Sequence, residues 1–169
     1  MLLHGESLNV ISKVIGTAYK ERDAKPIQEE ALDQKEKGMD YIDINLGPAK
    51  KDGHELMPWV CQTVQEVVPD MPLLLDTSNI AAIEEGLKVL KPASQPHIIN
   101  SIMARPERYE AMLPLCNKYD ADMVALLWGP DGLPRDENER AALAVELIYA
   151  ANEAGVENER IWVDGIVTP

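Results

Sequence analysis

Short apolar runs alternate with helical segments six times along this chain, and this order constrains the fold more than any other feature. Each run except the last is followed by a stretch whose apolar residues recur at helical spacing. Short apolar strands separated by helices are typical of a parallel sheet covered by helices. We expect strands at residues 2–6, 41–45, 71–77, 97–101, 122–128 and 161–164, and helices at 11–22, 23–38, 54–68, 80–90, 105–119 and 137–153.

The spacing of these units favours a barrel. Each strand–helix unit takes about 25–40 residues, close to the ~30 per unit of a (β/α)8 barrel with ~250 residues. The sequence has no Gly-rich phosphate loop of the GxGxxG or GxxxxGK[ST] type, which disfavours a nucleotide-binding doubly wound sheet. We therefore predict one α/β domain over residues 1–169, of the (β/α)8 TIM-barrel type, covering about the first six strand–helix units.

The charge balance argues against nucleic acid as a partner. The formal net charge is −13, from 29 acidic and 16 basic residues. Nucleic acid is disfavoured, because phosphate binding depends on clustered Lys and Arg. Most of these charges fit an ordinary solvated surface, and the excess of acids would favour a partner with a basic face.

Neither a membrane nor an oxidising compartment is indicated. No apolar run approaches the ~20 residues that a membrane helix needs, and the N-terminus lacks the pattern of a signal peptide. Cys61 and Cys116 lie far apart and form no CxxC motif, so we expect no disulfide framework. The sequence predicts a cytoplasmic protein.

A carboxylate closes the most apolar strand. Residues 73–75 are three leucines, and Asp76 follows them directly. A charge at the edge of a dry core usually needs a partner. An alternative interpretation is that residues 76–79 only cap the next helix, because Asp, Ser and Asn are common N-caps.

The same design recurs at the other strands. In a barrel of parallel strands, the carboxyl ends meet at the face that holds active sites. His97 begins its strand, so we expect it at the opposite face. Carboxylates alone can bind a metal, but single acids and amides on separate strands suit a neutral heterocycle with N–H donors and ring acceptors, and we predict no metal site. The polar strand-end residues are Glu6 and Asn9, Asp43 and Asn45, Asp76 and Ser78, Asn100 and Ser101, and Asp164.

Several of these segments carry a family resemblance. Residues 5–9, 41–47, 75–79, 99–101 and 162–164 resemble the pterin-binding methyltransferases, as does Gly132-Leu133-Pro134 with Asp136 and Arg140. The sequence looks most like the methyltetrahydrofolate:corrinoid/iron-sulfur protein methyltransferases. The folate domain of cobalamin-dependent methionine synthase and dihydropteroate synthase are more distant relatives in this resemblance.

The resemblance implies a substrate, a partner and residue roles. Asp76 and Asp164 would accept hydrogen bonds from ring N–H groups, Asn100 would bridge, and Asp43 and Asn45 would line the floor. For each, a purely structural hydrogen bond is the alternative. The implied reaction moves a methyl group between methyltetrahydrofolate and a cobalamin held by a partner corrinoid protein. Members of the family form dimers, so a homodimer is also expected.

One departure leaves the catalytic residue unidentified. The family barrel has eight strands, and its strand-seven amide near the reacting nitrogen has no counterpart in this sequence. We expect a fragment of a longer protein, an incomplete gene product, or a chain completed by another copy. A dihydropteroate synthase-like enzyme, or a non-catalytic module that binds pterin or docks a corrinoid protein, remain the alternatives.

Overall fold

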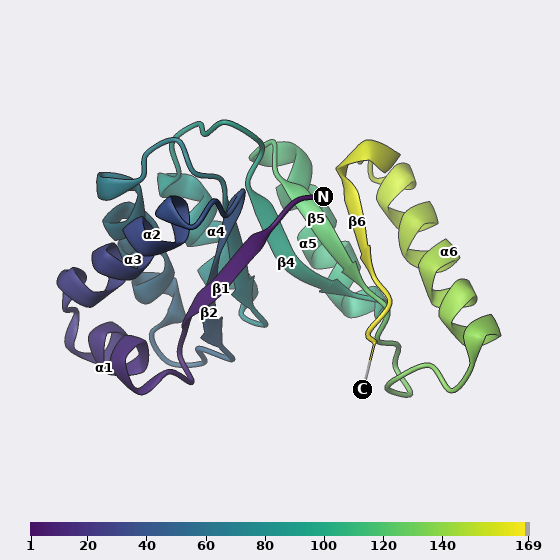
Figure 1. Cartoon of the computed structure of the whole chain (residues 1–169). Helices are drawn as coiled ribbons and strands as arrows, with labels where there is room; N and C mark the ends of the chain where they lie inside the picture. The colour runs from purple at the N-terminus through teal and green to yellow at the C-terminus, as the bar shows by residue number, and fades with distance from the viewer. Residues whose placement is uncertain (168–169) are drawn as a thin grey trace. The chain divides into compact units, whose positions relative to one another are not determined.

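The computed structural model describes residues 1–167, in which six strands alternate with helices (Figure 1). The strands are β1 (His4–Asn9), β2 (Tyr41–Gly47), β3 (Leu73–Thr77), β4 (Ile98–Met103), β5 (Asp122–Leu126) and β6 (Ile161–Asp164). The helices are α1 (Lys13–Glu21), α2 (Ala24–Glu36), α3 (Gly53–Val67), α4 (Ile80–Val89), α5 (Pro106–Lys118) and α6 (Glu137–Glu153), with a 3-10 helix at Asn158–Arg160. They form two compact units, Met1–Ile98 and a second that begins at Ile99. The prediction of a single domain stays a prediction.

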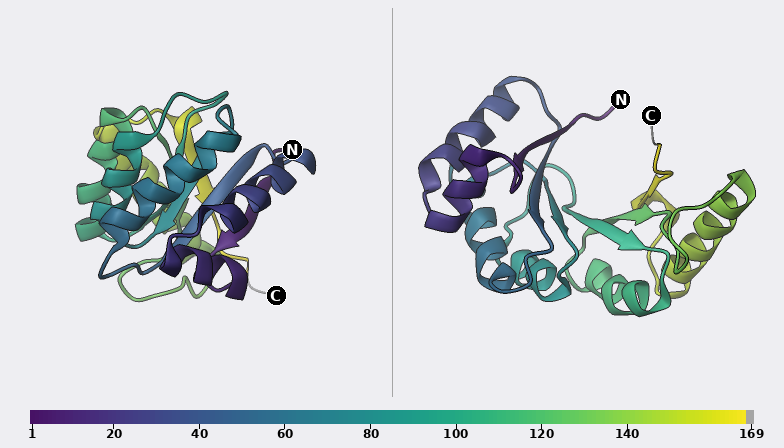
Figure 2. Two further views of the ribbon diagram at one scale, coloured as in Figure 1. Left: turned by 90° about the vertical axis from the view of Figure 1, so that its left-hand side faces the viewer. Right: turned by 90° about the horizontal axis from the view of Figure 1, so that it is seen from below.

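The first unit is a parallel three-stranded sheet with helices packed on it. β1 pairs with β2, and β2 with β3, in chain order. Figure 2 shows α1 to α4 on one face of these strands. All three leucines of β3 are at most 2% exposed, as the apolar run predicts for a strand buried on both faces.

A close approach at Gly86 identifies the face of β3 that meets the helices. A Cβ on Gly86 of α4 would lie 2.6 Å from Leu75 Cδ2 and 2.6 Å from Met57 Cγ of α3. Leu75 therefore points into the helical layer. Because successive strand residues alternate between faces, Leu74 and Asp76 point to the other side of the sheet.

The second unit pairs β5 with β6 in parallel, from Met123 opposite Ile161 to Leu126 opposite Asp164. Ala104, just after β4, donates its N–H to the Leu126 carbonyl at 3.3 Å. Leu147 of α6 is fully buried. In Figure 2, α5 and α6 lie on one face of the strands of this unit.

The predicted boundaries are correct for the last helix and the last strand, and they are wrong for the first strand. α6 and β6 have the predicted bounds. Residues 7–9, which follow the strand predicted at residues 2–6, belong to β1, because Leu8 and Asn9 pair with Ile44 and Asn45 of β2. β2 likewise continues through residues 46–47, and β5 ends two residues early, at Leu126. Residues 168–169, after β6, lie outside the described part of the chain.

The cysteines and His97 agree with the predictions from sequence. Cys61 and Cys116 are free and buried. His97 lies at the amino end of β3, because Leu73, the first residue of that strand, donates its N–H to His97 Nδ1 at 3.0 Å. Over residues 1–167, no helix has the length and apolarity needed to span a membrane.

Candidate functional site

Asp76 and Asn45 form the centre of the strand-end residues in the first unit. They lie opposite each other in the parallel register of β2 and β3, so their side chains share one face. Asn45 Nδ2 donates a short hydrogen bond to Asp76 Oδ2. Asn45 Oδ1 in turn accepts the Gly47 N–H at 2.9 Å. The amide therefore connects the end of β2 to the carboxylate on β3.

The surroundings of Asp76 favour its protonated form. Burial, first, and the negative charge of Glu6, second, raise the pKa of this carboxyl to about 6, against the opposing effect of the hydrogen bond from Asn45. A carboxyl group that titrates near neutral pH can accept a hydrogen bond when ionised and donate one when protonated. Such perturbed groups are candidates for a functional site.

Asp43 is the more deeply buried acid of β2. It is 3% exposed and shares a strand face with Asn45. Burial raises the pKa of Tyr19 well above its usual value, and the charge of Asp43 adds to that effect. The Tyr19 hydroxyl donates to the Leu8 carbonyl at 2.7 Å, so this ring fixes β1 against α1.

Glu6 and Asn9 of β1 differ in their roles. Asn9 Oδ1 accepts the Ile11 N–H at 3.0 Å, which stabilises the turn after β1. Glu6 is exposed and acts on Asp76 through its charge. Both also border an open groove of about 870 Å³ on the side of α1 and α2. The other acids that line this groove are Glu29, Glu30 and Asp33.

Thr77 and Asn79, on either side of Ser78, hold the loop that follows β2. The sequence did not predict this role for them. Thr77 Oγ1 donates to the Gly47 carbonyl at 2.6 Å. Asn79 Nδ2 donates to the Ala49 carbonyl at 2.8 Å, and Asn79 Oδ1 accepts the Ala82 N–H at 3.2 Å as the cap of α4. The capping interpretation is therefore correct for Asn79, whereas Asp76 bonds to Asn45. Ser78, between them, is exposed.

In the second unit, Asp164 ends β6. Its Oδ1 accepts the Ile166 N–H at 2.8 Å, and its carbonyl accepts the Leu127 N–H at 3.1 Å. Arg140 of α6 donates to the Gly165 carbonyl and, at 3.1 Å, to the Ile166 carbonyl. Arg140 thus anchors the turn that follows Asp164, a role that sequence spacing could not show.

Asn100 and Ser101 lie on β4 of the second unit, and both are half-buried. They precede the strand end at Met103 by two or three residues. The amide and hydroxyl expected at this strand are therefore partly accessible.

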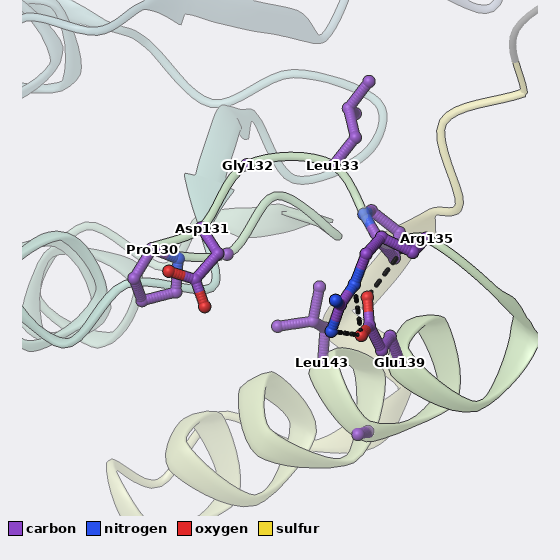
Figure 3. A pocket seen from close by; sticks show the side chains of 10 residues that line it. Pro130, Asp131, Gly132, Leu133, Arg135, Glu139 and Leu143 are labelled. Carbon is purple, nitrogen blue, oxygen red and sulfur yellow. Dashed lines mark hydrogen bonds and ion pairs between the residues drawn. The ribbon is translucent and has the colours of Figure 1, made fainter.

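A separate pocket of about 440 Å³ follows β5 (Figure 3). A tight hairpin forms one wall, with Gly129 and Gly132 joined by two backbone hydrogen bonds of 3.0 and 3.1 Å. Arg135 and Glu139 line the other side as an ion pair, with Arg135 Nε 2.7 Å from Glu139 Oε1. None of the strand-end residues predicted to bind a ligand lines this pocket.

No metal centre is evident over residues 1–167, because no three His, Cys, Asp or Glu side chains come together in a metal-binding group there. The strand ends present acids and amides, which form hydrogen bonds. Together with the alternating strands and helices, these groups define an α/β protein with polar side chains near the carboxyl ends of its strands.

Comparison with known proteins gives the family. The family model described as "Pterin binding enzyme" matches residues 5–168, and the chain therefore belongs to the pterin-binding enzyme family. The methylcorrinoid:tetrahydrofolate methyltransferase of Eubacterium limosum is 29% identical over 170 residues, which span 99% of this chain and 61% of that relative. The chain thus spans about three fifths of that relative's length.

A solved structure confirms the fold class. The dihydropteroate synthase of Xanthomonas albilineans, determined with 4-aminobenzoic acid, matches with a TM-score of 0.69 and 22% identity. The match covers 96% of this chain and 58% of that protein. The fold is therefore of the predicted α/β barrel type, with six strands and the helices between them over the described residues.

Proposed function

We propose that this chain binds a reduced pterin and takes part in methyl transfer between methyltetrahydrofolate and the cobalt of a corrinoid protein. The observation that carries the proposal is the Asp76 carboxylate, half-buried at a strand end and bonded to Asn45 in a chain that matches the pterin-binding family. The name of the Eubacterium relative supports the methyl-transfer reaction.

The residues would act by recognition and orientation. Asp76 and Asp164 would accept N–H groups of the pterin ring, and Asn100 would pair with a ring edge through its amide. Asp43, Glu6, Asn9, Ser78 and Ser101 would surround the ring. A cobalamin on the partner would supply the nucleophile. This chain would hold the methyl group in line, which accounts for much of the catalysis when the nucleophile is external.

Acid-to-alanine variants test the binding role. Asp76→Ala and Asp164→Ala should each weaken methyltetrahydrofolate binding by roughly 1–3 kcal/mol, the range for hydrogen bonds to charged groups. Calorimetric titration measures this loss. Asp122→Asn is the matched control, because Asp122 lies at the start of β5, where its Oδ2 accepts the Trp162 indole N–H at 3.2 Å. Unchanged affinity in folded Asp76→Ala and Asp164→Ala would show that both acids are structural.

A transfer assay separates the alternatives. Methylation of a cob(I)alamin acceptor by bound methyltetrahydrofolate would support the methyltransferase. Binding without transfer would favour a non-catalytic pterin-binding module. Failure to bind folate, with binding of a pterin pyrophosphate, would favour a dihydropteroate synthase-like enzyme. The homodimer and the cytoplasmic location expected from the sequence stay predictions.

A further inference from the structure

The Asn45 amide forms a hydrogen bond at each of its two ends. Its Nδ2 donates to Asp76 Oδ2, and its Oδ1 accepts the Gly47 N–H at 2.9 Å. Its backbone carbonyl also accepts the Val10 N–H at 3.0 Å. The residue is therefore held by β3, by its own strand and by the segment after β1.

Backbone chemistry fixes the orientation of this amide. A backbone N–H only donates, so the atom that faces Gly47 must be the oxygen of the amide. The nitrogen then faces Asp76. Gly47 is itself held in place, because its φ is +59° and its carbonyl accepts the Thr77 hydroxyl at 2.6 Å. A flipped amide would leave the Gly47 N–H without an acceptor and would direct an oxygen at the carboxylate.

We propose that Asn45 is a positioning residue for Asp76: it holds the carboxylate in one orientation and leaves Oδ1 for an N–H of the bound ring. This inference rests on the proposed function, which makes Asp76 a pterin-binding residue. It replaces the expectation that Asn45 lines the floor of the site by direct contact. Asn45 acts on the ligand through Asp76.

The charges around Asp76 explain why such a residue is needed. Burial and the charge of Glu6 from β1 both raise the pKa of Asp76, and the Asn45 donor is the influence that lowers it. Asp43, also on β2, contributes a further acid on the same strand face. A donor hydrogen bond favours the charged form of a carboxyl group. Without Asn45, Asp76 would ionise only at higher pH.

Two variants at residue 45 separate positioning from a structural role. Asn45→Ala removes the donor and should raise the pKa of Asp76. Asn45→Asp keeps an oxygen for the Gly47 N–H but presents a second carboxylate to Asp76, so it should raise that pKa further. Asn79→Ala is the matched control, because it also removes two side-chain hydrogen bonds in this unit. It should lower stability and leave the titration of Asp76 unchanged.

The experiment follows the Asp76 carboxyl carbon by NMR across pH in the ligand-free chain, beside the pH dependence of methyltetrahydrofolate binding. The pH dependence of binding should move upward together with the carboxyl titration, and a rise of about 1 in the Asp76 pKa should weaken binding about tenfold at pH values below that pKa. An unchanged Asp76 titration in both Asn45 variants would overturn the proposal, as would loss of folding in both. If the wild-type chain binds no folate, the proposed function fails, and the ligand-free titration alone decides whether Asn45 controls Asp76.

Discussion

At the scale of single residues, the ionised Asp76 carboxylate lowers the stability of the fold, whereas the proposed function uses it to bind the ligand. Its folded pKa is about 6, above the ordinary value of 3.8. A raised folded pKa contributes stability that is fully present below the unfolded pKa and is lost as pH rises through the folded pKa. At neutral pH the folded chain therefore carries an ionised group that its surroundings disfavour. A residue retained against stability is the expected behaviour of a binding group.

Asp76→Asn should consequently stabilise the protein and weaken its binding of folate. The neutral amide keeps an oxygen for Asn45 and removes the buried charge. We expect a gain in unfolding free energy of about 1–3 kcal/mol near pH 7.5, which shrinks as the pH falls to about 5. Urea unfolding at the two pH values measures the gain. A loss of stability near neutral pH would show that the Asp76 charge has a structural partner.

The sequence predicted Asp76 as a candidate binding residue, but it could not predict that the Asn45 amide bonds to Asp76. Asp76 was recognisable because a charge directly follows three leucines. The role of Asn45 depends on its register opposite Asp76, and a single sequence does not give the register between strands. Arg140 was noticed only through a family resemblance, because its contacts with residues 165–166 join segments 25 and 26 positions apart.

At the scale of elements, periodicity predicted which segments are strands and helices, and tertiary pairing decided where they end. The polar residues 6 and 7 concealed the continuation of β1, which its pairing with β2 supports through Asn9. α6 was predicted with correct bounds because its cap is local: Asp136 Oδ1 accepts the Glu139 N–H at 2.9 Å. An element end that is fixed by a local cap can thus be predicted from the sequence, whereas an end that is fixed by pairing with a distant strand cannot.

The contact between β1 and α2 gives a prediction that sequence alone would not suggest. A Cβ on Gly5 would lie 1.9 Å from Gln34 Oε1, and Gln34 is only 3% exposed. Gly5→Ala should destabilise the protein by about 1–3 kcal/mol, as overpacking does. In a Gln34→Ala background the same change should cost less, by at least ~0.5 kcal/mol of coupling. Additive effects in denaturant unfolding would show that α2 moves freely away from β1.

His97 connects the starts of two strands and should make stability depend on pH. Its Nδ1 accepts the Leu73 N–H at 3.0 Å, and its Nε2 lies 2.9 Å from the Lys91 carbonyl, which fits a neutral ring. Burial lowers the pKa of His97 below its ordinary 6.5. The unfolded chain then binds the proton more readily, so this contribution is present above pH ~6.5 and decreases as the pH falls through that value.

His97→Ala should therefore flatten the loss of stability between about pH 8 and pH 5.5, besides lowering stability at pH 8 by about 1–3 kcal/mol through the unpaired Leu73 N–H. His54→Ala is the control, because the His54 side chain is 54% exposed. Urea unfolding of both variants at the two pH values measures the slope. An unchanged slope in His97→Ala would assign the pH dependence to other groups, such as Asp76.

At the scale of the whole molecule, the proposed pterin-binding residues are distributed over the two compact units. Glu6, Asn45 and Asp76 belong to the first, and Asn100 and Asp164 to the second. A ligand that binds only the folded chain stabilises the segments it contacts. Hydrogen exchange in each unit therefore tests the binding residues proposed for that unit.

We expect methyltetrahydrofolate to bind once per chain and to slow amide exchange at residues 73–79 and at residues 161–166. Hydrogen exchange followed by mass spectrometry measures both segments in one sample. Asp164→Asn should weaken binding and reduce the protection of residues 161–166, while Asp122→Asn should leave both segments protected. Protection confined to residues 73–79, and unaffected by Asp164→Asn, would mean that the first unit binds the ligand without Asp164. The recognition role of the second unit would then be wrong, although the role of Asp76 would stand.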